Sequence, residues 1–483
     1  RLMVNVLLSE DDEALTTPGI IRTVYDPACG TGGMLSVAEA HAKDHNRDAT
    51  MELFGQELNT EAYAICQSDM MLRGHKAENI AFGNSFTKDG HPDGRFHYCL
   101  SNPPFGVEWK TARDFIVKEA RRGYAGRFGA GLPRINDGSL LFLQHMVSKM
   151  RPPTEGGTRI AVVLNGSPLF TGAAGSGESE IRRWIIESDW LEAIIALPDQ
   201  LFYNTGIATY VWIVTNRKAK ARRGQVQLIN GVEMYEKKRT SKGNKRKELG
   251  EANMAELSRL YGVFSEGEQV RIFANQAFGF QRITVERPLK LDFQACPERI
   301  ARLEQERGWQ NLVKSRKKGA AGKAEIEAGR RNQRQVLQVL KGMDTAQVYL
   351  DRKAFRKTLG RAMRAAGVPL GASLRRSIES ALGECNEAAV VCRDSKGQPE
   401  PDSGLRDNEN VPLGVGLEDY MEREVWPHVP GAWVDETKTK VGYEIPFTRH
   451  FYEYEAPRVL EEIEREILGL EKEVGQLLRG VFR

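Results

Sequence analysis

Between residues 22 and 215, short β-rich runs alternate with longer segments of helical periodicity. This alternation is typical of a mostly parallel sheet whose strands are connected by helices. We therefore expect a doubly wound α/β domain. Its predicted strands cover residues 22–26, 50–57, 78–83, 96–101, 158–164, 191–197 and 208–215. Its predicted helices cover residues 32–43, 60–73, 139–150 and 178–187.

The chain has 483 residues, which is too long for one core, because single cores rarely exceed about 250 residues. Its composition changes after Asn216, and residues 217–247 hold twelve Lys or Arg against two Glu. We predict four regions along the chain. They are residues 1–216, the α/β domain; 217–297, its basic extension; 298–430, a charged helical region with a polar linker; and 431–483, a C-terminal segment with a heptad helix.

Several classes of protein are excluded by composition. No apolar run approaches the roughly 20 residues that a membrane span needs, so we expect no membrane. Six scattered cysteines form no C-x-x-C pair and no zinc-ligand grouping, which predicts a reduced, cytoplasmic chain without a metal site. Residues 1–8 are mostly apolar and lack the pattern of a secretory leader, so we expect the sequence to begin within a helix.

A glycine-rich turn joins the first predicted strand to the first helix. It reads Asp26-Pro-Ala28-Cys-Gly30-Thr31-Gly32-Gly33. Gly30, Gly32 and Gly33 let the backbone turn tightly and approach a ligand in front of a helix N-terminus. This pattern predicts a nucleotide-type pocket, although a dinucleotide site and a purely structural turn also fit it.

Polar residues follow the next two predicted strands. Glu57 ends the second strand, where its carboxylate can accept both hydroxyls of a ribose. Asn84 and Ser85 follow the third strand, and the Asn84 amide could contact an adenine edge while Phe86 covers the ring. Taken singly, Asn84 also fits an ordinary turn residue. Together these residues predict an adenosine-cofactor site.

The fourth predicted strand ends in Ser101-Asn102-Pro103-Pro104-Phe105-Gly106, the most specific signal in the chain. The two prolines fix the backbone and lack N–H donors, so the Pro103 carbonyl and the Asn102 side-chain oxygen can converge as acceptors. Two such acceptors suit a planar amino group, whose attack on a methyl donor builds positive charge on nitrogen. We predict Asn102 to Phe105 as the catalytic residues, with Phe105 stacking on a base flipped out of a duplex.

Residues 105–137 interrupt the α/β pattern and contain several glycines and arginines. A long loop after a chemical motif is commonly functional. Because the net charge is only +4, any basic surface must come from local clusters. The candidate contacts to DNA phosphates are Arg113, Arg121, Arg122, Arg127 and Arg134. A second basic cluster, residues 237–247, fits a DNA contact or a flexible charged loop equally well.

The last helix carries an apolar stripe that alternates steps of three and four residues. This stripe predicts a partner helix, from another subunit or from the same domain. Its members are Leu460, Ile463, Ile467, Leu470, Val474, Leu477 and Val481.

The glycine-rich turn and residues Asn102 to Phe105 together resemble the amino-methyltransferases. The sequence of the turn resembles that of the modification subunit of type I restriction-modification systems. Segments 159–166, 197–202, 205–214 and 443–452 are also similar to that family. The resemblance implies a Rossmann-like, seven-stranded, S-adenosyl-L-methionine-dependent methyltransferase sheet that modifies adenine N6 in double-stranded DNA. It also implies assembly with a DNA-specificity subunit, at two methyltransferase subunits per specificity subunit, and with a restriction subunit for cleavage.

Two features depart from that family. Its N-terminal helical domain and its Phe-Thr-Pro-Arg-like motif do not precede the first strand here, so we expect part of the cofactor pocket to be missing from this sequence. The family often has Asp where Asn84 stands.

Two other functions also fit: the same chemistry on RNA bases or on a protein glutamine, and a non-catalytic scaffold.

Overall fold

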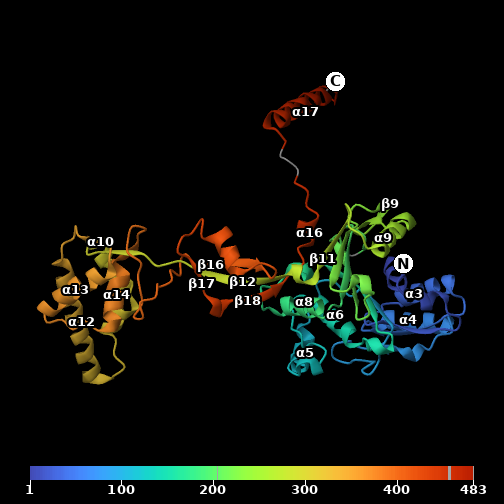
Figure 1. The fold of residues 1–483 in the computed structure, drawn as a ribbon, viewed down its shortest axis with the longest axis horizontal. Helices are drawn as coiled ribbons and strands as arrows, with labels where there is room; N and C mark the ends of the chain where they lie inside the picture. Colours follow the sequence, from blue (N-terminus) through green and yellow to red (C-terminus); the bar gives the residue numbers. More distant parts are fainter. Residues whose placement is uncertain (204, 455–457, 482–483) are drawn as a thin grey trace. The chain divides into compact units, whose positions relative to one another are not determined.

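The computed structural model describes residues 1–203, 205–454 and 458–481. The chain divides into two compact units, which are residues 1–279 with 442–483 (unit 1) and residues 280–441 (unit 2). Figure 1 shows the elements of both units.

Unit 1 is built on a nine-stranded sheet of order β11-β8-β6-β7-β5-β4-β1-β2-β3. All seven predicted strands are confirmed, and two further strands extend the sheet beyond residue 216. Only β7 and β11 run antiparallel to their neighbours. The strands are β1 (Ile21–Asp26), β2 (Thr50–Glu57), β3 (Ile80–Phe82), β4 (Tyr98–Ser101), β5 (Arg159–Asn165), β6 (Leu191–Leu197), β7 (Thr209–Thr215), β8 (Gln225–Asn230) and β11 (Val270–Ala274).

The four predicted helices are present within two residues of their expected ends. Asn59 caps α4 and Ser176 caps α8 by accepting backbone N–H bonds, which explains where these two begin. The helices of the sheet region are α1 (Leu2–Leu8), α2 (Asp12–Thr16), α3 (Gly33–His45), α4 (Thr60–Leu72), α5 (Arg113–Ala120), α6 (Ser139–Ser148), α7 (Ser167–Phe170), α8 (Gly177–Glu187) and α9 (Glu251–Val263).

The prediction of a loop over residues 105–137 is wrong in one part, because the segment contains helix α5. Its apolar side chains form a small core of their own, in which Trp109, Ile116 and Phe128 pack with Phe86 and Leu141. The surrounding glycines conceal the helical period in the sequence. This packing brings the segment back onto the sheet, next to the end of β3.

Helix α1 is buried among apolar side chains of the main core and lies beside α3 and α9 (Figure 1). Beneath it lies a buried ion pair. Arg159 of β5 donates to Glu192 Oε2 of β6 at 2.7 Å, to the Leu7 carbonyl of α1 at 3.1 Å and to the Tyr261 hydroxyl of α9 at 2.5 Å. One guanidinium therefore joins two strands and two helices.

A basic hairpin, formed by β9 (Glu236–Lys242) and β10 (Lys245–Glu248), contacts the turn after β6. The N–H of Asn244 donates to the Tyr203 carbonyl and the N–H of Arg246 donates to the Gln200 carbonyl, both at 3.0 Å. Lys247 pairs with Asp199 at 2.6 Å. The hairpin is thus held by backbone bonds at the carboxyl edge of the sheet.

Unit 2 has two apolar clusters, one around the helices and one around a small antiparallel sheet. That sheet has the order β16-β12-β17. The strands are β12 (Gly279–Glu286), β13 (Leu291–Gln294), β14 (Val348–Tyr349), β15 (Gly383–Cys385), β16 (Asp407–Pro412), β17 (Trp433–Val434) and β18 (Lys440–Tyr443). The helices are α10 (Pro297–Ala301), α11 (Arg307–Gln310), α12 (Gly319–Lys341), α13 (Arg352–Ala365), α14 (Ala372–Leu382) and α15 (Leu417–Tyr420).

The C-terminal part of the chain returns to unit 1, where Tyr443 N–H donates to Ser179 Oγ at 2.9 Å and Arg182 donates to the Tyr443 carbonyl at 2.6 Å. Helices α16 (Phe447–His450) and α17 (Leu460–Val481) follow. The side chains of the stripe from Leu460 to Leu477 are exposed, and Val481 lies outside the residues whose side chains are described. Across the described residues, no helix combines the length and apolarity that crossing a membrane requires.

We expect Glu192→Gln to lower the free energy of unfolding by about 3–5 kcal/mol, because it leaves the buried Arg159 cation without its counter-charge. Chemical denaturation measures this. As a control, the double change Arg159→Met and Glu192→Leu removes both charges and should cost less than Glu192→Gln alone. A larger loss in the double variant would contradict the interpretation.

Candidate active site

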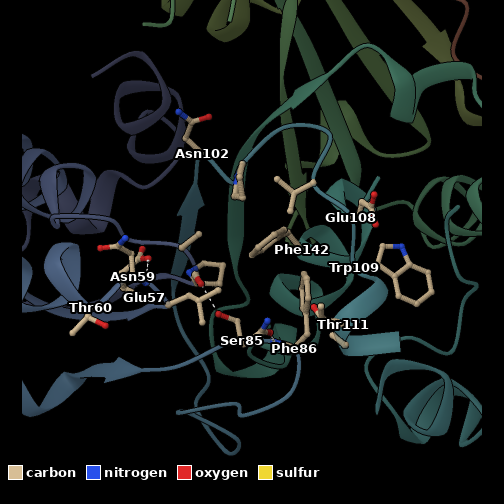
Figure 2. A pocket seen from close by; sticks show the side chains of 18 residues that line it. Glu57, Asn59, Thr60, Ser85, Phe86, Asn102, Glu108, Trp109, Thr111 and Phe142 are labelled. Atoms are coloured by element: carbon tan, nitrogen blue, oxygen red, sulfur yellow. Dashed lines mark hydrogen bonds between the residues drawn. The ribbon is translucent and has the colours of Figure 1, made fainter. Parts of the chain in front are cut away.

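A pocket of about 760 Å³ opens at the carboxyl edge of β1, β2, β3 and β4. In Figure 2, Glu57 and Asn59 lie on one side of it and Phe86, Trp109 and Phe142 on the other, with Asn102 at one end. The volume lies in the range of small-molecule sites, which are roughly 300–1,000 Å³. The pocket therefore coincides with the edge where the sequence predicts its site.

The glycine-rich turn adopts a left-handed backbone at two of its glycines. Gly30 and Gly32 have φ of +54° and +83°. A Cβ at Gly32 would come within 2.8 Å of Cys66 Sγ, so this position excludes other residues. The Gly30 N–H donates to Glu57 Oε2 at 2.8 Å, and the Asn59 N–H donates to Glu57 Oε1 at 2.7 Å. Glu57 thus fixes the turn to the end of β2.

Asp26 lies buried below the pocket rather than in its lining. Its Oδ1 accepts from the Ala28 N–H at 3.0 Å and from Ser101 Oγ at 2.8 Å. Burial, partly offset by these two bonds, raises the pKa of Asp26 to about 7. The carboxyl joins the glycine-rich turn to the residue just before Asn102.

The end of β3 is held by the segment 105–137. Arg127 donates at 2.7 Å to the carbonyls of Ser85 and Phe86 and to both carboxylate oxygens of Glu119. It also bonds His145 Nδ1 at 3.0 Å. Burial, followed by the Arg127 charge, lowers the pKa of His145 to about 3, so this imidazole is neutral and accepts from the guanidinium.

Asn84 and Ser85 both line the pocket, but their oxygens bond within the chain. Asn84 Oδ1 accepts from the Phe86 N–H at 2.8 Å, which is a turn contact. Ser85 Oγ donates to the Pro27 carbonyl at 2.6 Å. Ser85 therefore links the end of β3 to the glycine-rich turn.

The four residues predicted to be catalytic divide in position. Asn102 and Pro104 line the pocket and are exposed, whereas Pro103 is buried. Phe105 is outside the lining and packs edge-on against Phe202, with ring centroids 5.7 Å apart. Of the nine predicted cofactor residues, the pocket is lined by Ala28, Glu57, Asn84 and Ser85. Not in the lining are Asp26, Gly30, Thr31, Gly32 and Gly33.

The five arginines predicted to contact DNA also differ in environment. The guanidinium of Arg127 is engaged by the contacts given above, with its side chain only 12% exposed, so it holds the site together and offers no free face. Arg134 donates to Ser167 Oγ at 2.8 Å and keeps 46% of its side chain exposed. Arg113, Arg121 and Arg122 are exposed. The DNA contacts stay a prediction for these four.

Several residues of the lining were not predicted from the sequence. Most come from the segment after Gly106, where no motif marks them, and Phe142 comes from α6. Trp109 and Phe142 pack with Phe86 in one small apolar core, a tertiary contact that no local sequence pattern marks. The unpredicted lining residues are Pro27, Leu58, Asn59, Thr60, Val107, Glu108, Trp109, Thr111, Ala112, Gly138 and Phe142. No cluster of three metal-ligating side chains occurs among the described residues.

The sheet places antiparallel β7 between β5 and β6, and a glycine-rich turn follows β1. Residues 1–283 match the model of the N-6 DNA Methylase family. The chain belongs to that family.

Two relatives are similar over more than half of this chain. The methylase subunit of the type I restriction enzyme MjaVII of Methanocaldococcus jannaschii is 30% identical over 279 residues, 57% of this chain and 44% of the relative. The methylase subunit of HindI of Haemophilus influenzae is 30% identical over 318 residues, 63% of this chain and 66% of the relative. The chain thus spans about half to two thirds of the length of these relatives.

Among solved structures, the type I restriction-modification methyltransferase subunit from Streptococcus thermophilus aligns with a TM-score of 0.47 at 24% identity. The alignment covers 57% of this chain and 55% of that one.

We expect Asp26→Asn to raise the melting temperature at pH 8 and to have little effect at pH 4. Between the ordinary pKa of 3.8 and about 7, the folded protein binds a proton that the unfolded chain does not. The unfolding free energy of the wild type therefore falls as pH rises through this window and stays low above it. The amide oxygen of Asn can still accept both hydrogen bonds.

Thermal melts from pH 4 to 8 measure this difference. Asp114→Asn is the matched control, because Asp114 is fully exposed. A difference between Asp26→Asn and the wild type that does not change with pH would rule out the assigned titration.

Proposed function

We propose that this chain is the catalytic part of a type I modification subunit, a cytoplasmic enzyme that transfers a methyl group from S-adenosyl-L-methionine to adenine N6 in double-stranded DNA. The observation that carries the proposal is the placement of Asn102 and Pro104 in one pocket with Glu57 and the turn that it fixes. Family membership and the names of the relatives support it.

The residues of the pocket fit the adenosyl cofactor. Gly30 and Gly32 give the turn its left-handed backbone, and Glu57 retains lone pairs for the ribose hydroxyls, because each carboxylate oxygen uses only one in the contacts given above. Among the described residues the Asn84 Nδ2 group has no partner, so it can donate to an adenine ring nitrogen. Phe86 supplies an apolar wall. When bound, S-adenosylmethionine supplies an electrophilic methyl group on a sulfonium.

The chemistry proposed for Asn102 and Pro103 is hydrogen-bond acceptance. Their oxygens accept the two hydrogens of the adenine amino group, which favours a tetrahedral nitrogen and stabilises the positive charge that develops on it. The nitrogen forms a bond to the methyl carbon as the carbon–sulfur bond breaks, and the electron pair of that bond stays on sulfur. One proton then leaves the methylated nitrogen to solvent, so no dedicated base is needed. Collinear positioning supplies much of the acceleration.

Phe105 and the basic hairpin are proposed to serve the DNA. Phe105 packs against Phe202, and we propose that this pair forms the wall on which a flipped adenine stacks. The hairpin contacts the same turn, residues 199–203, so its exposed Lys237, Arg239 and Arg246 lie on the side from which a duplex would approach.

The partners proposed are a DNA-specificity subunit, with two methyltransferase subunits for each, and a restriction subunit in the cleaving complex. Two features support a partner at α17: its regular apolar stripe and the exposure of that stripe, with 58% of Ile467 and 55% of Leu470 accessible. A second amphipathic helix from the specificity subunit would bury both of these side chains. Sequence choice would then lie on that subunit.

We expect Asn102→Ala to lower methyl transfer by about 10²–10³-fold while leaving S-adenosylmethionine affinity unchanged within about twofold, since one acceptor of the developing charge is lost. Labelled methyl transfer to an adenine-containing duplex, followed by nucleoside analysis, measures the methylation rate. Calorimetry measures the affinity for S-adenosylmethionine. Asn311→Ala in unit 2 is the control. Full activity in Asn102→Ala, or label in RNA or a protein glutamine and none in DNA, would disprove the proposal.

We expect Ile467→Asp with Leu470→Asp to abolish co-purification with the specificity subunit, because both charges would be buried in the helix interface. Leu468→Asp is a matched control, since Leu468 is 57% exposed on the same helix but off the stripe. Equal retention of the partner by both variants would show that the stripe is not the contact.

A further inference from the structure

Positive charge is concentrated in one part of unit 2. Residues 307–376 contain eighteen Lys or Arg and four Asp or Glu, a net charge of +14, although the whole chain carries only +4. The family model ends at residue 283 and assigns nothing to this segment. It corresponds to helices α11, α12 and α13 with the start of α14, which share one apolar cluster.

Helix α13 shows how this charge is arranged. Phe355, Leu359 and Met363 are fully buried in the cluster and define the inner face. The outer face carries cations at i, i+4, i+8 and i+11, which point to one side of a helix. These four residues, all exposed, are Lys353, Lys357, Arg361 and Arg364. No Asp or Glu lies within α13, so its outer face is purely cationic.

Helix α12 presents a second row of the same kind. Lys323, Arg330, Arg334 and Lys341 follow one another at steps of seven, four and seven residues and are all exposed. Glu327 is the one acid on that side of the helix. Opposite it, Val336 and Leu340 are buried in the shared apolar cluster.

Little of this charge is neutralised inside the protein. Among the described residues, Arg352 pairs with Glu400, Arg356 and Arg375 reach Glu379, and Lys317 lies 3.9 Å from Glu325. None of the four outer cations of α13 has an acidic partner in the part of the chain that is described. The excess is therefore open to a polyanion.

The arrangement also opposes the stability of the helix. Lys353 lies in the first turn of α13, where the helix dipole disfavours a cation. Lys353 with Lys357, and Lys357 with Arg361, are like-charged pairs at i, i+4, which repel each other. A face selected for folding alone would alternate the signs of its charges, so this one points to a ligand of opposite charge.

We propose that the basic face of α13, with the neighbouring row on α12, is a binding site for the phosphate backbone of duplex DNA that is separate from the methyl-transfer pocket. The choice of DNA as the polyanion rests on the proposed function. A duplex carries one negative charge per roughly 1.7 Å of its axis and gains affinity by releasing counterions to such cations. Single strands are less suited, because bases stack on exposed aromatic side chains, and among residues 291–400 Tyr349 is partly buried while Phe293, Trp309 and Phe355 are buried.

The contact is independent of DNA sequence. Lys and Arg on an outer helix face bind phosphates, whereas sequence reading needs side chains aimed at base edges in a groove. The site would add affinity to a complex whose sequence choice lies on another subunit. It would also retain the duplex while the catalytic pocket acts on one base.

The test compares two fourfold variants of the full chain that lose equal charge. The first is Lys353→Gln, Lys357→Gln, Arg361→Gln and Arg364→Gln. The control is Arg47→Gln, Lys76→Gln, Lys220→Gln and Arg223→Gln, all exposed in unit 1. Binding to a fluorescent 30-base-pair duplex is followed by anisotropy over a range of salt concentrations, and each fold is checked by circular dichroism and S-adenosylmethionine binding.

We expect the α13 variant to bind the duplex at least about tenfold more weakly than the wild type at 100 mM salt. Its slope of log affinity against log salt should be smaller by about 2 to 4. The control variant should bind with an affinity near that of the wild type. Equal losses in both variants, or no loss in the α13 variant, would overturn the site. A wild type that prefers duplex RNA through α13 would overturn the choice of DNA.

The two half variants, Lys353→Gln with Lys357→Gln and Arg361→Gln with Arg364→Gln, keep the test decisive if the fourfold variant unfolds; each should reduce the salt slope by about 1 to 2. If the wild type binds duplex DNA through α13 but transfers no methyl group, the proposed function fails and the binding site stands.

Discussion

The buried carboxyl group of Asp26 is the constraint on which the site depends. It accepts one hydrogen bond from the glycine-rich turn and one from Ser101, so β1 and β4 end in a fixed relation. Glu57 extends the same frame to the end of β2 through Gly30 and Asn59. The ligand side of the pocket is consequently built from backbone that is already fixed before any ligand binds, which lowers the entropy lost on binding.

The segment after Gly106 completes this frame from the opposite side. Arg127 reaches the carbonyls of Ser85 and Phe86, and its charge is balanced by Glu119 from the same segment. The aromatic core around Trp109 then covers the pocket. A single insertion thus both shapes the wall of the pocket and secures the end of β3. The end of β3 and the wall around Trp109 are therefore linked through one segment.

The features of the site that could be predicted from the sequence are those that depend on local residue types. Gly32, Glu57 and Asn102 follow predicted strands within the alternation of strands and helices, so their positions at the carboxyl edge could be derived from that pattern alone. Phe105 and Arg127 could not. The Phe105 ring turns toward Phe202, nearly 100 residues away in the chain, and Arg127 is neutralised by partners that no local pattern brings near it. Such contacts depend on the path of the backbone between distant segments.

The sequence by itself determined the α/β class and the seven strands from β1 to β7, because these follow from periodicity, and it predicted amino-group chemistry for the Asn-Pro-Pro-Phe motif from backbone restriction by proline. Only the tertiary structure decided that β8 and β11 extend the sheet, that α1 fills the core over Arg159, and that the cations of α13 share one open face. These outcomes depend on which surfaces are buried against each other, and burial is a property of packing between residues far apart in the chain.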